Sequence, residues 1–290
     1  MTAPDKQTAG AGFDALLPAD MALKAEETGV AKAALGWRNT LALGVLGGAF
    51  IALGGVFCST ALAGAGQMAW GPARLLGGLA FSLGLILVVV AGAELFTGNN
   101  LIVMAWASGR VSSRRLLSNW VLVYLGNFLG ALAIAALVFV SGQYAFGGGG
   151  VGRVLLGAAA AKCAYGWGQA LALGVLCNAL VCLAIWLCYS ARTTADKVLS
   201  IILPISAFVA AGFEHCIANM YFVPLALFIK AGAPAEFWQG LGAGPEAYAA
   251  LSWGRFLWGN LLPVTLGNIL GGSGMVGLVY WFIYIRKRPA

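Results

Sequence analysis

The sequence predicts an all-α membrane protein whose six transmembrane helices form two inverted three-helix repeats, with the second and fifth helices broken. Composition is the first observation: the 290 residues are 61% hydrophobic and only 9% charged, whereas a soluble domain carries about 25% charged residues. The second observation is a set of six long apolar segments separated by polar or glycine-rich connectors. The third is a polar motif that occurs twice, in matched form, inside two of those segments.

The net charge of +7 comes from residues at helix ends rather than from one basic patch. The positive-inside rule accounts for such residues, so we expect a lipid bilayer and no nucleic acid as the surroundings of this chain. The first 20 residues lack the basic and apolar regions of a cleaved signal peptide, which favours a cytoplasmic start. Six cysteines without a Cys-x-x-Cys pair, and a single histidine, predict no metal site and no cofactor.

Residues 1–36 are expected to form a cytoplasmic region with one amphipathic helix. Pro18 suits a first helical turn and Gly36 suits a helix stop, and the five charged side chains between them are too many for a membrane span. We expect this helix to lie along the membrane surface. A structural collar is favoured over a gate.

A single transmembrane domain is expected over residues 37–285, followed by a basic cytoplasmic tail at 286–290. Its apolar segments lie at about 37–63, 74–109, 116–141, 163–190, 198–229 and 256–285. The glycine run at 147–150 lacks the Gly-Lys-Ser/Thr of a phosphate-binding loop, so it is expected to be a flexible turn.

The distribution of basic residues predicts that both termini are cytoplasmic. With six spans, twelve basic residues fall on the cytoplasmic side and five on the outer side, as the positive-inside rule requires. The cytoplasmic set is Lys6, Lys24, Lys32, Arg38, Arg110, Arg114, Arg115, Arg192, Lys197, Arg286, Lys287 and Arg288. The outer set is Arg74, Arg153, Lys162, Lys230 and Arg255.

Two of the apolar segments are too long for one continuous span. As helices, 74–109 and 198–229 would measure roughly 54 Å and 48 Å, against a hydrocarbon core of about 30 Å. Each contains a polar, glycine-bearing stretch, AGAELFTGNN at 91–100 and AGFEHCIANM at 211–220. Non-helical backbone at that depth is stable only where protein or a water-lined cavity satisfies it. Each stretch therefore predicts a break that lines a pore or a binding site.

The two breaks belong to an internal repeat. Both contain Gly-x-Glu-x-x-x-small-Asn, with Glu94 and Asn99 in the first and Glu214 and Asn219 in the second. LALGVL occurs at 41–46 and 171–176, and LGNFLG at 125–130 matches LGNILG at 266–271. The halves, about 37–141 and 165–285, have three spans each, so the second enters the membrane from the opposite side. Half-helix ends that meet at mid-depth predict a path for a small polar solute or anion.

Several motifs resemble the formate/nitrite transporter family, and within it the formate channels. They are FSLGLIL at 81–87, AELFTG at 93–98, VLSIILP at 198–204, EHCIANM at 214–220, PVTLGNILGG at 263–272 and the opening LLPADMALKAEETGVAKA. The resemblance runs from about Leu17 to Arg286. It implies an aquaporin-like protomer, a homopentamer with one pore per protomer, and permeation of formate and similar small monovalent anions across the bacterial inner membrane.

The resemblance also implies roles for individual residues. His215 matches the central pore histidine, and Thr97 matches the threonine of the mobile loop in the broken helix. Polar positions around the histidine are matched by Lys162, Asn178, Glu214 and Asn268. Apolar constrictions of the path are matched by Phe81, Leu85 and Phe208. After Thr97, the sequence Gly98-Asn99-Asn100 does not indicate a particular anion.

Each role has a structural alternative. His215 beside Glu214 in a membrane indicates function, although a core histidine with satisfied hydrogen bonds is the common case. Carboxylates repel anions, so Glu94 and Glu214 are expected to accept hydrogen bonds that hold the breaks open. Thr97 suits helix capping as well as solute contact. Lys162 suits either an interface position or an attractive charge at the pore mouth.

The hypothesis for function is a channel for formate in which a passing anion meets His215, with proton coupling at low pH. Nitrite or hydrosulfide permeation is the alternative within the same fold. An intramembrane enzyme is less favoured, because no Ser or Cys nucleophile is paired with a second base. A water or glycerol pore would leave His215 without a role.

Overall fold

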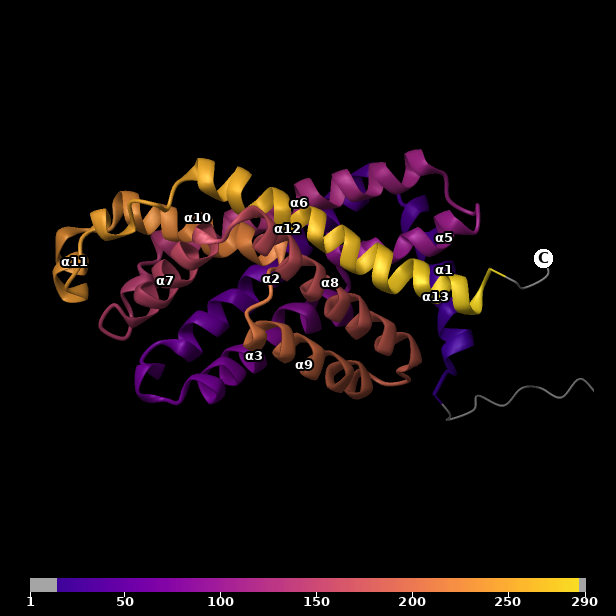
Figure 1. Cartoon of the computed structure of the whole chain (residues 1–290), viewed down its shortest axis with the longest axis horizontal. Coiled ribbons are helices and arrows are strands. Elements are labelled where there is room, and N and C mark those ends of the chain that lie inside the picture. The colour runs from indigo at the N-terminus through magenta and orange to yellow at the C-terminus, as the bar shows by residue number, and fades with distance from the viewer. Residues whose placement is uncertain (1–14, 287–290) are drawn as a thin grey trace, which may run out of the picture.

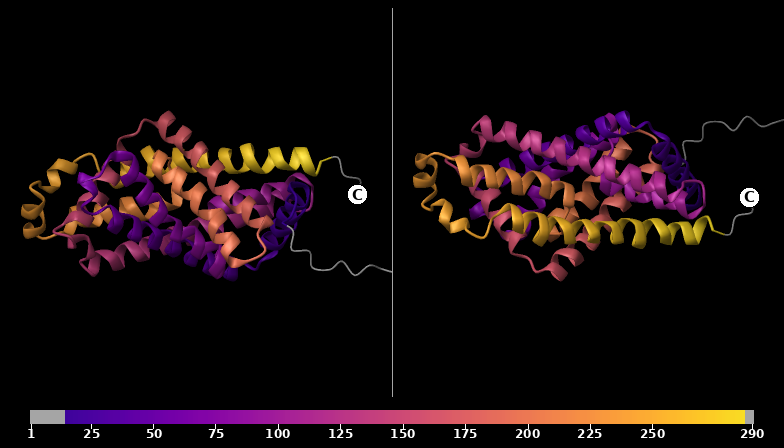
Figure 2. Two further views of the ribbon diagram at one scale, coloured as in Figure 1. Left: turned by 90° about the horizontal axis from the view of Figure 1, so that it is seen from below. Right: turned by 90° about the horizontal axis from the view of Figure 1, so that it is seen from above.

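The computed structural model describes residues 15–286, and within that range every regular element is helical. The long helices run along the long axis of the molecule (Figures 1 and 2). The first helix and the last helix lie at the same end, where Met21 and Ala22 pack against Trp281 and Tyr284. The expected positions of Lys6, Lys287 and Arg288, and most of the basic tail, lie outside the described residues.

The first repeat is a group of helices in which the second span is broken. Its elements are α1 (Pro18–Ala34), α2 (Trp37–Leu62), η1 (Ala65–Gln67), α3 (Trp70–Ile86), η2 (Leu87–Gly92), α4 (Phe96–Asn99), η3 (Asn100–Ile102), α5 (Val103–Ala107), α6 (Ser113–Val140) and η4 (Gln143–Ala145). The η2 segment is a π-helical continuation of α3. Chain irregularity thus begins one turn before the break.

The second repeat follows the same order. Its elements are α7 (Gly150–Ala164), α8 (Trp167–Ser190), α9 (Thr194–Ala211), α10 (Cys216–Gly232), α11 (Ala235–Leu241), η5 (Pro245–Tyr248), η6 (Arg255–Leu261), α12 (Leu262–Ile269), η7 (Leu270–Leu278) and α13 (Val279–Tyr284). The run from η6 to α13 is one long helix with two π-helical parts. α9 and α10 together form the broken fifth span.

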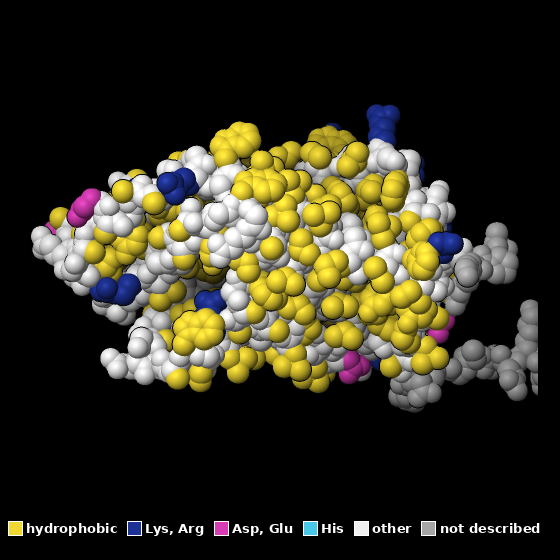
Figure 3. Space-filling model, in the orientation of Figure 1, with side chains coloured by type: hydrophobic (Ala, Val, Ile, Leu, Met, Phe, Trp, Pro, Cys, Tyr) yellow, Lys and Arg dark blue, Asp and Glu magenta, His cyan; other side chains and the backbone are white. Residues whose placement is uncertain are grey.

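Six helical runs within residues 15–286 are long and apolar enough to cross a membrane, which agrees with the predicted number. They are Trp37–Leu62, Trp70–Gly92, Ser113–Val140, Trp167–Ser190, Thr194–Ala211 and Arg255–Tyr284. On the face shown in Figure 3, hydrophobic side chains cover the middle of the molecule, and most charged side chains lie toward its two ends. α10 differs from these runs because most of its side chains are buried inside the protein.

Both predicted breaks are present, and each begins at a glycine. Gly92 and Gly212 have φ angles of +83° and +77°, which side-chain-bearing residues rarely adopt. Residues 93–95 and 213–215 are extended, and a new helix starts at Phe96 or Cys216. The breaks are therefore shorter than the polar stretches that predicted them.

One helix differs from expectation. Residues 150–164 were expected to divide between a connector and the start of the fourth span, but they form a separate helix, α7. Gly147, Gly148 and Gly149 do form the expected turn, with positive φ at all three. α7 precedes α8 as α1 precedes α2, so the repeat begins earlier in each half than the sequence motifs indicated.

Glycines that lie against the backbone of a neighbouring helix bring the helices of each repeat together. A Cβ atom on Gly48 or Gly130 would collide with backbone atoms of the opposite helix in the α2–α6 pair. Gly267 and Gly271 lie in the same way against α8. Small residues permit this backbone approach in membrane proteins, and here it holds each break against its neighbouring helices.

Candidate functional site

Two cavities approach the breaks from opposite ends of the molecule. The inner cavity, of about 460 Å³, lies between α1, α8 and the first break, and its lining includes Lys24, Lys32 and Glu94. The outer cavity, of about 140 Å³, is lined by α7, the start of α3 and the second break, including Lys162 and His215. The side chains between these cavities define the candidate site.

An ion pair from the preceding helix holds the first break. The Nζ atom of Lys32 on α1 lies 2.7 Å from Oε1 of Glu94 and 3.0 Å from Oδ1 of Asn99. Asn99 donates to the other oxygen of Glu94 and, at 2.9 Å, to Oδ1 of Asn119 on α6. The Asn119 amide donates in turn to the backbone oxygen of Lys32 at 3.3 Å. This closed ring of bonds satisfies a carboxylate at membrane depth.

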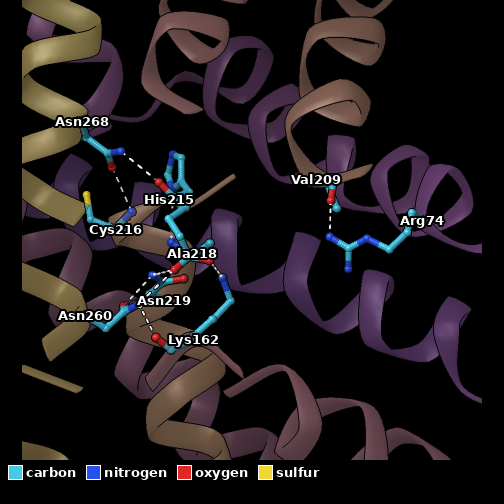
Figure 4. A network of polar contacts seen from close by, with 10 residues as sticks. Arg74, Lys162, Val209, His215, Cys216, Ala218, Asn219, Asn260 and Asn268 are labelled. Carbon is cyan, nitrogen blue, oxygen red and sulfur yellow. Dashed lines mark hydrogen bonds and ion pairs between the residues drawn. The ribbon is translucent and has the colours of Figure 1, made fainter. Parts of the chain in front are cut away.

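The second break repeats this ring with the other half of the chain (Figure 4). Nζ of Lys162 on α7 lies 2.7 Å from Oε1 of Glu214. Asn219 donates to Oε2 of Glu214 at 2.7 Å and to Oδ1 of Asn260 at 2.7 Å. Asn260 donates to the backbone oxygen of Lys162 at 3.0 Å and to Glu214 at 3.0 Å. Both predicted glutamates thus accept hydrogen bonds that fix the breaks.

A further asparagine fixes the extended backbone of each break. Nδ2 of Asn127 donates to the carbonyls of Gly44 and Glu94 at 2.7 and 2.9 Å, and its oxygen accepts from the Phe96 N–H at 2.9 Å. Asn268 makes the matching three bonds at the second break, with lengths of 2.8, 3.0 and 2.9 Å. These bonds replace the helical hydrogen bonds that each break has lost.

The two breaks meet through Thr97 and His215. Nε2 of His215 lies 3.1 Å from Oγ1 of Thr97, and the histidine is 2% exposed. Nδ1 of His215 accepts the Ala218 N–H at 3.1 Å, so His215 caps the start of α10. An accepting Nδ1 carries no proton, so the neutral ring has its N–H at Nε2, directed at the Thr97 hydroxyl.

Asn178 joins the first break to the helix of Asn268. Its Nδ2 donates to the carbonyls of Thr97 and Asn268 at 3.2 and 2.8 Å and to Oδ1 of Asn100 at 2.9 Å. The three acceptors around this nitrogen assign the orientation of the amide. Its Oδ1 is buried without a partner among the described residues, which leaves one acceptor in this region unused.

An aromatic pair lies beside His215 at the outer cavity. The rings of Phe81 and Phe208 meet edge to face with centroids 5.8 Å apart, and Phe208 stacks on the His215 ring at 5.8 Å. Phe81 and Phe208 line the outer cavity, whereas Leu85 is buried and lines neither cavity. Leu95, the counterpart of His215 in the first break, lines the inner cavity.

When His215 is neutral, both cavities are lined by more positive than negative side chains. The inner cavity has three lysines, Lys24, Lys32 and Lys197, and a single carboxylate, Glu94. The outer cavity has Arg74 and Lys162 against Glu214. Because walls of low dielectric strengthen the field of such charges, both mouths attract anions.

The structure brings most of the predicted site residues together in two hydrogen-bonded groups, one at each break. His215, Thr97, Asn178, Glu214, Lys162, Asn219 and Asn268 form one connected network, with Phe208 and Phe81 next to it; Glu94 and Asn99 form the matching ring. Prediction missed Lys32, Asn119 and Asn260. A signal existed, because Lys32 and Lys162 each lie nine residues before LALGVL. Asn119 and Asn260 likewise lie eight residues before Asn127 and Asn268.

Comparison with known proteins agrees with this architecture. The sequence profile of the formate/nitrite transporter family matches residues 19–282. The chain is 47% identical to the formate channel FocA of Escherichia coli K12 over 276 residues, which cover 95% of this chain and 97% of that protein. It is 43% identical to the formate channel FocA of Haemophilus influenzae, over 91% of this chain and 93% of that protein.

Two solved structures are similar as well. One is described as a pentameric formate channel with formate bound, with a TM-score of 0.82 and 46% identity, covering 86% of this chain and 98% of that one. The other is an FNT family ion channel, with a TM-score of 0.73 and 29% identity, covering 91% and 98%. The paired breaks, the profile over nearly the whole chain and these relatives show that the chain belongs to the formate/nitrite transporter family.

Proposed function

We propose that this chain forms a channel for formate and similar small monovalent anions, with one pore in each protomer. The observation that carries the proposal is a pair of cavities that are open to opposite ends, rich in positive charge and separated by a short apolar barrier beside His215. The relatives that cover nearly the whole chain are named formate channels.

The geometry supports a defined sequence of contacts for a passing anion. Arriving from either cavity, it exchanges water for the N–H of His215 and the hydroxyl of Thr97, which meet at 3.1 Å. Asn178 and Asn268 hold the backbone around these two groups. Phe81 and Phe208 limit the water that accompanies the anion. Leu85, one turn further along α3, is proposed as a further constriction, although it lines neither cavity.

Proton coupling follows from the same site. A simple carboxylic acid has a pKa of about 4, so formate is almost entirely anionic at neutral pH. Crossing an apolar barrier as the neutral acid avoids most of the desolvation penalty of the charge. In this proposal His215 takes up a proton from solution at low pH, and the resulting imidazolium passes that proton to formate and returns to its neutral form. This step adds proton-coupled uptake at low pH to anion conduction at neutral pH.

The remaining polar residues have a positioning role in this proposal. Glu214, Lys162 and Asn219 hold the second break, and Glu94 and Asn99 hold the first, so none of them needs to contact the anion. Lys162 is thus paired, and its charge at the outer mouth is offset by Glu214. This arrangement lets the carboxylates lie near an anion path without repelling the anion.

We further propose a homopentamer in the bacterial inner membrane with both termini in the cytoplasm. The similar solved channel is described as pentameric. The distribution of basic residues favours cytoplasmic termini, and α1 and α13 pack together at one end of the protomer. In this division, residues 1–36 form a cytoplasmic collar that carries α1, residues 37–285 form one transmembrane channel domain, and 286–290 form its tail.

Transport rather than catalysis is proposed because the relatives are named channels and transporters. The purified protein in proteoliposomes is expected to release labelled formate down its gradient. Formate, nitrite, hydrosulfide and chloride are then offered as competitors at equal concentration. The proposal expects formate to compete best; stronger competition by nitrite or hydrosulfide would assign the alternative substrate, and absence of formate flux would contradict the proposed function.

A further inference from the structure

Arg74, at the start of α3, is held in a defined orientation at the wall of the outer cavity. Its Nε donates to the carbonyl of Ala210 at 3.3 Å, and its Nη2 donates to the carbonyl of Val209 (Figure 4). Both carbonyls belong to the last turn of α9, just before the second break. These two bonds fix one edge of the guanidinium group and so prevent free rotation of the side chain.

The opposite edge of the same guanidinium is free. Arg has five N–H donors, and the bonds to Ala210 and Val209 use two on the edge that contains Nε. The edge formed by Nη1 and the second hydrogen of Nη2 has no hydrogen bond among the described residues, and Figure 4 shows the unbonded nitrogen turned away from Val209. That edge presents two parallel N–H groups, the arrangement that binds a carboxylate through both oxygens.

Arg74 is also the uncompensated charge of the outer cavity. Lys162 and Glu214 neutralise one another at 2.7 Å, and no carboxylate among residues 15–286 lies within ion-pair distance of Arg74. The negative end of the α9 dipole amounts to about half a unit charge, so it offsets only part of the arginine charge. The outer cavity therefore keeps its positive excess at Arg74.

Arg74 lies close to the Phe81–Phe208 pair, so its charge can act on an anion that approaches this pair. Arg74 lines the same cavity as Phe81, Phe208 and His215, and its carbonyl partner Val209 directly follows Phe208 in α9. An anion held by Arg74 is thus in the cavity that the aromatic pair lines. Its next partner is the N–H of His215, whose ring stacks on Phe208.

We propose that Arg74 forms a carboxylate-binding subsite in the outer cavity, which loads the anion before it crosses the Phe81–Phe208 barrier. The inference rests on the proposed anion transport and adds a specific residue to it. The two free N–H groups favour planar oxyanions over spherical ones such as chloride, because only the former accept both hydrogen bonds at once. Arg74 is thus a determinant of substrate class and of capture.

Charge reversal by chemical labelling tests the subsite on one folded protein. Arg74→Cys is prepared in a Cys58→Ala background, because Cys58 lines the same cavity, and the purified protein is labelled in detergent. Two methanethiosulfonate reagents of similar size attach either a trimethylammonium or a sulfonate group. Labelled formate flux is then measured in proteoliposomes at low ionic strength, where surface charges are least screened.

The cationic adduct is expected to restore formate flux to within two-fold of the unlabelled parent, Cys58→Ala. Each unit of charge removed at a few ångströms from the path lowers the flux by about five-fold in a largely aqueous mouth. The anionic adduct differs from arginine by two units of charge, so it is expected to lower the flux by about 25-fold. Equal flux with both adducts would overturn the proposed subsite. Cys58→Ala with Arg74 intact, treated with both reagents, serves as the control and should not change.

Arg74→Lys tests the paired N–H groups separately from charge. The lysine keeps the positive charge and lacks the fork, so flux at low ionic strength should stay within two-fold while competition by chloride against formate strengthens about three-fold. Unchanged competition would contradict recognition by the fork. Absence of formate flux in the unlabelled parent would contradict the proposed function instead, so the two failures are distinguishable.

Discussion

Thr97 and His215 belong to opposite repeats, and their side chains meet at 3.1 Å in the middle of the protein. Each is positioned by its own break: Thr97 lies in α4 after the first, and His215 caps α10 after the second. The contact therefore depends on both breaks at once. A displacement of either one separates the two groups that we propose contact the passing anion.

His215→Asn is expected to remove the contribution of the histidine to the pH dependence of formate flux. Asparagine caps helices well, so it can accept the Ala218 N–H and preserve the start of α10, but it does not titrate near neutral pH. The ratio of wild-type to variant flux in proteoliposomes should therefore change between about pH 5 and pH 7. A ratio that stays constant over that range would contradict the proposed histidine mechanism.

Thr97→Val is expected to lower formate flux about ten-fold, because valine keeps the shape of the side chain and removes the hydroxyl that His215 contacts. Thr97→Ser keeps the hydroxyl and should stay within about three-fold of wild type. Both are measured at neutral pH in matched proteoliposomes. If valine and serine variants carry formate equally fast, the hydroxyl has no part in transport.

Lys162→Met is expected to destabilise the protein more than the matched Lys32→Met. Glu214 would lose its counter-charge at a side chain only 2% exposed, and breaking a buried ion pair from one side costs about 3–5 kcal/mol. The Lys32 side chain is 30% exposed and the Lys162 side chain 17%, so water compensates the lost charge better in Lys32→Met. Thermal unfolding in detergent measures both.

The double variant Lys162→Met/Glu214→Gln is the control for this comparison. It removes both charges, so most of the lost stability should return, although the hydrogen bonds from Asn219 and Asn260 weaken. A double variant as unstable as Lys162→Met would show that lost packing, and not the unpaired carboxylate, causes the effect.

Gly130→Ala is expected to disrupt the first repeat, because the new Cβ would overlap the carbonyl oxygen of Val45 on α2. Overpacking of this kind costs about 1–3 kcal/mol and shifts the backbone. The matched control is Gly157→Ala on α7, where the structure has nothing within 4 Å of the added atom. Yield of folded protein after detergent extraction measures both, and equal yields would contradict the close helix contact.

The breaks could be predicted from sequence because they oppose the composition around them. A glutamate within an apolar run is costly in a membrane, so Glu94 and Glu214 marked the interruptions directly, and the glycines at 92 and 212 supplied the required backbone geometry. Matched motifs then indicated the inverted repeat. The similarity of both halves in the structure agrees with that reading.

Helix α7 could not be separated from its neighbours because alanine and glycine dominate residues 150–164 and give no clear boundary. The ion pairs were missed for a different reason. Lys32 and Glu94 are 62 residues apart in sequence, so only the fold brings them together. Phe81 and Phe208 were singled out through family resemblance alone, because nothing distinguishes an aromatic barrier residue from one that faces lipid.

The two half-helices that follow the breaks differ in how they are built. After the first, a helical run from Phe96 to Ala107 changes from α- to 3-10-helical geometry and back, through α4, η3 and α5. After the second, α10 continues unbroken for 17 residues and is mostly buried. Both segments are mostly buried, but a shorter and less regular helical run opens at lower free energy than a longer regular helix, so amide hydrogen exchange should be faster in the first segment. On this expectation the centre of the protein has one compliant wall, which carries Thr97, and one stiff wall, which carries His215.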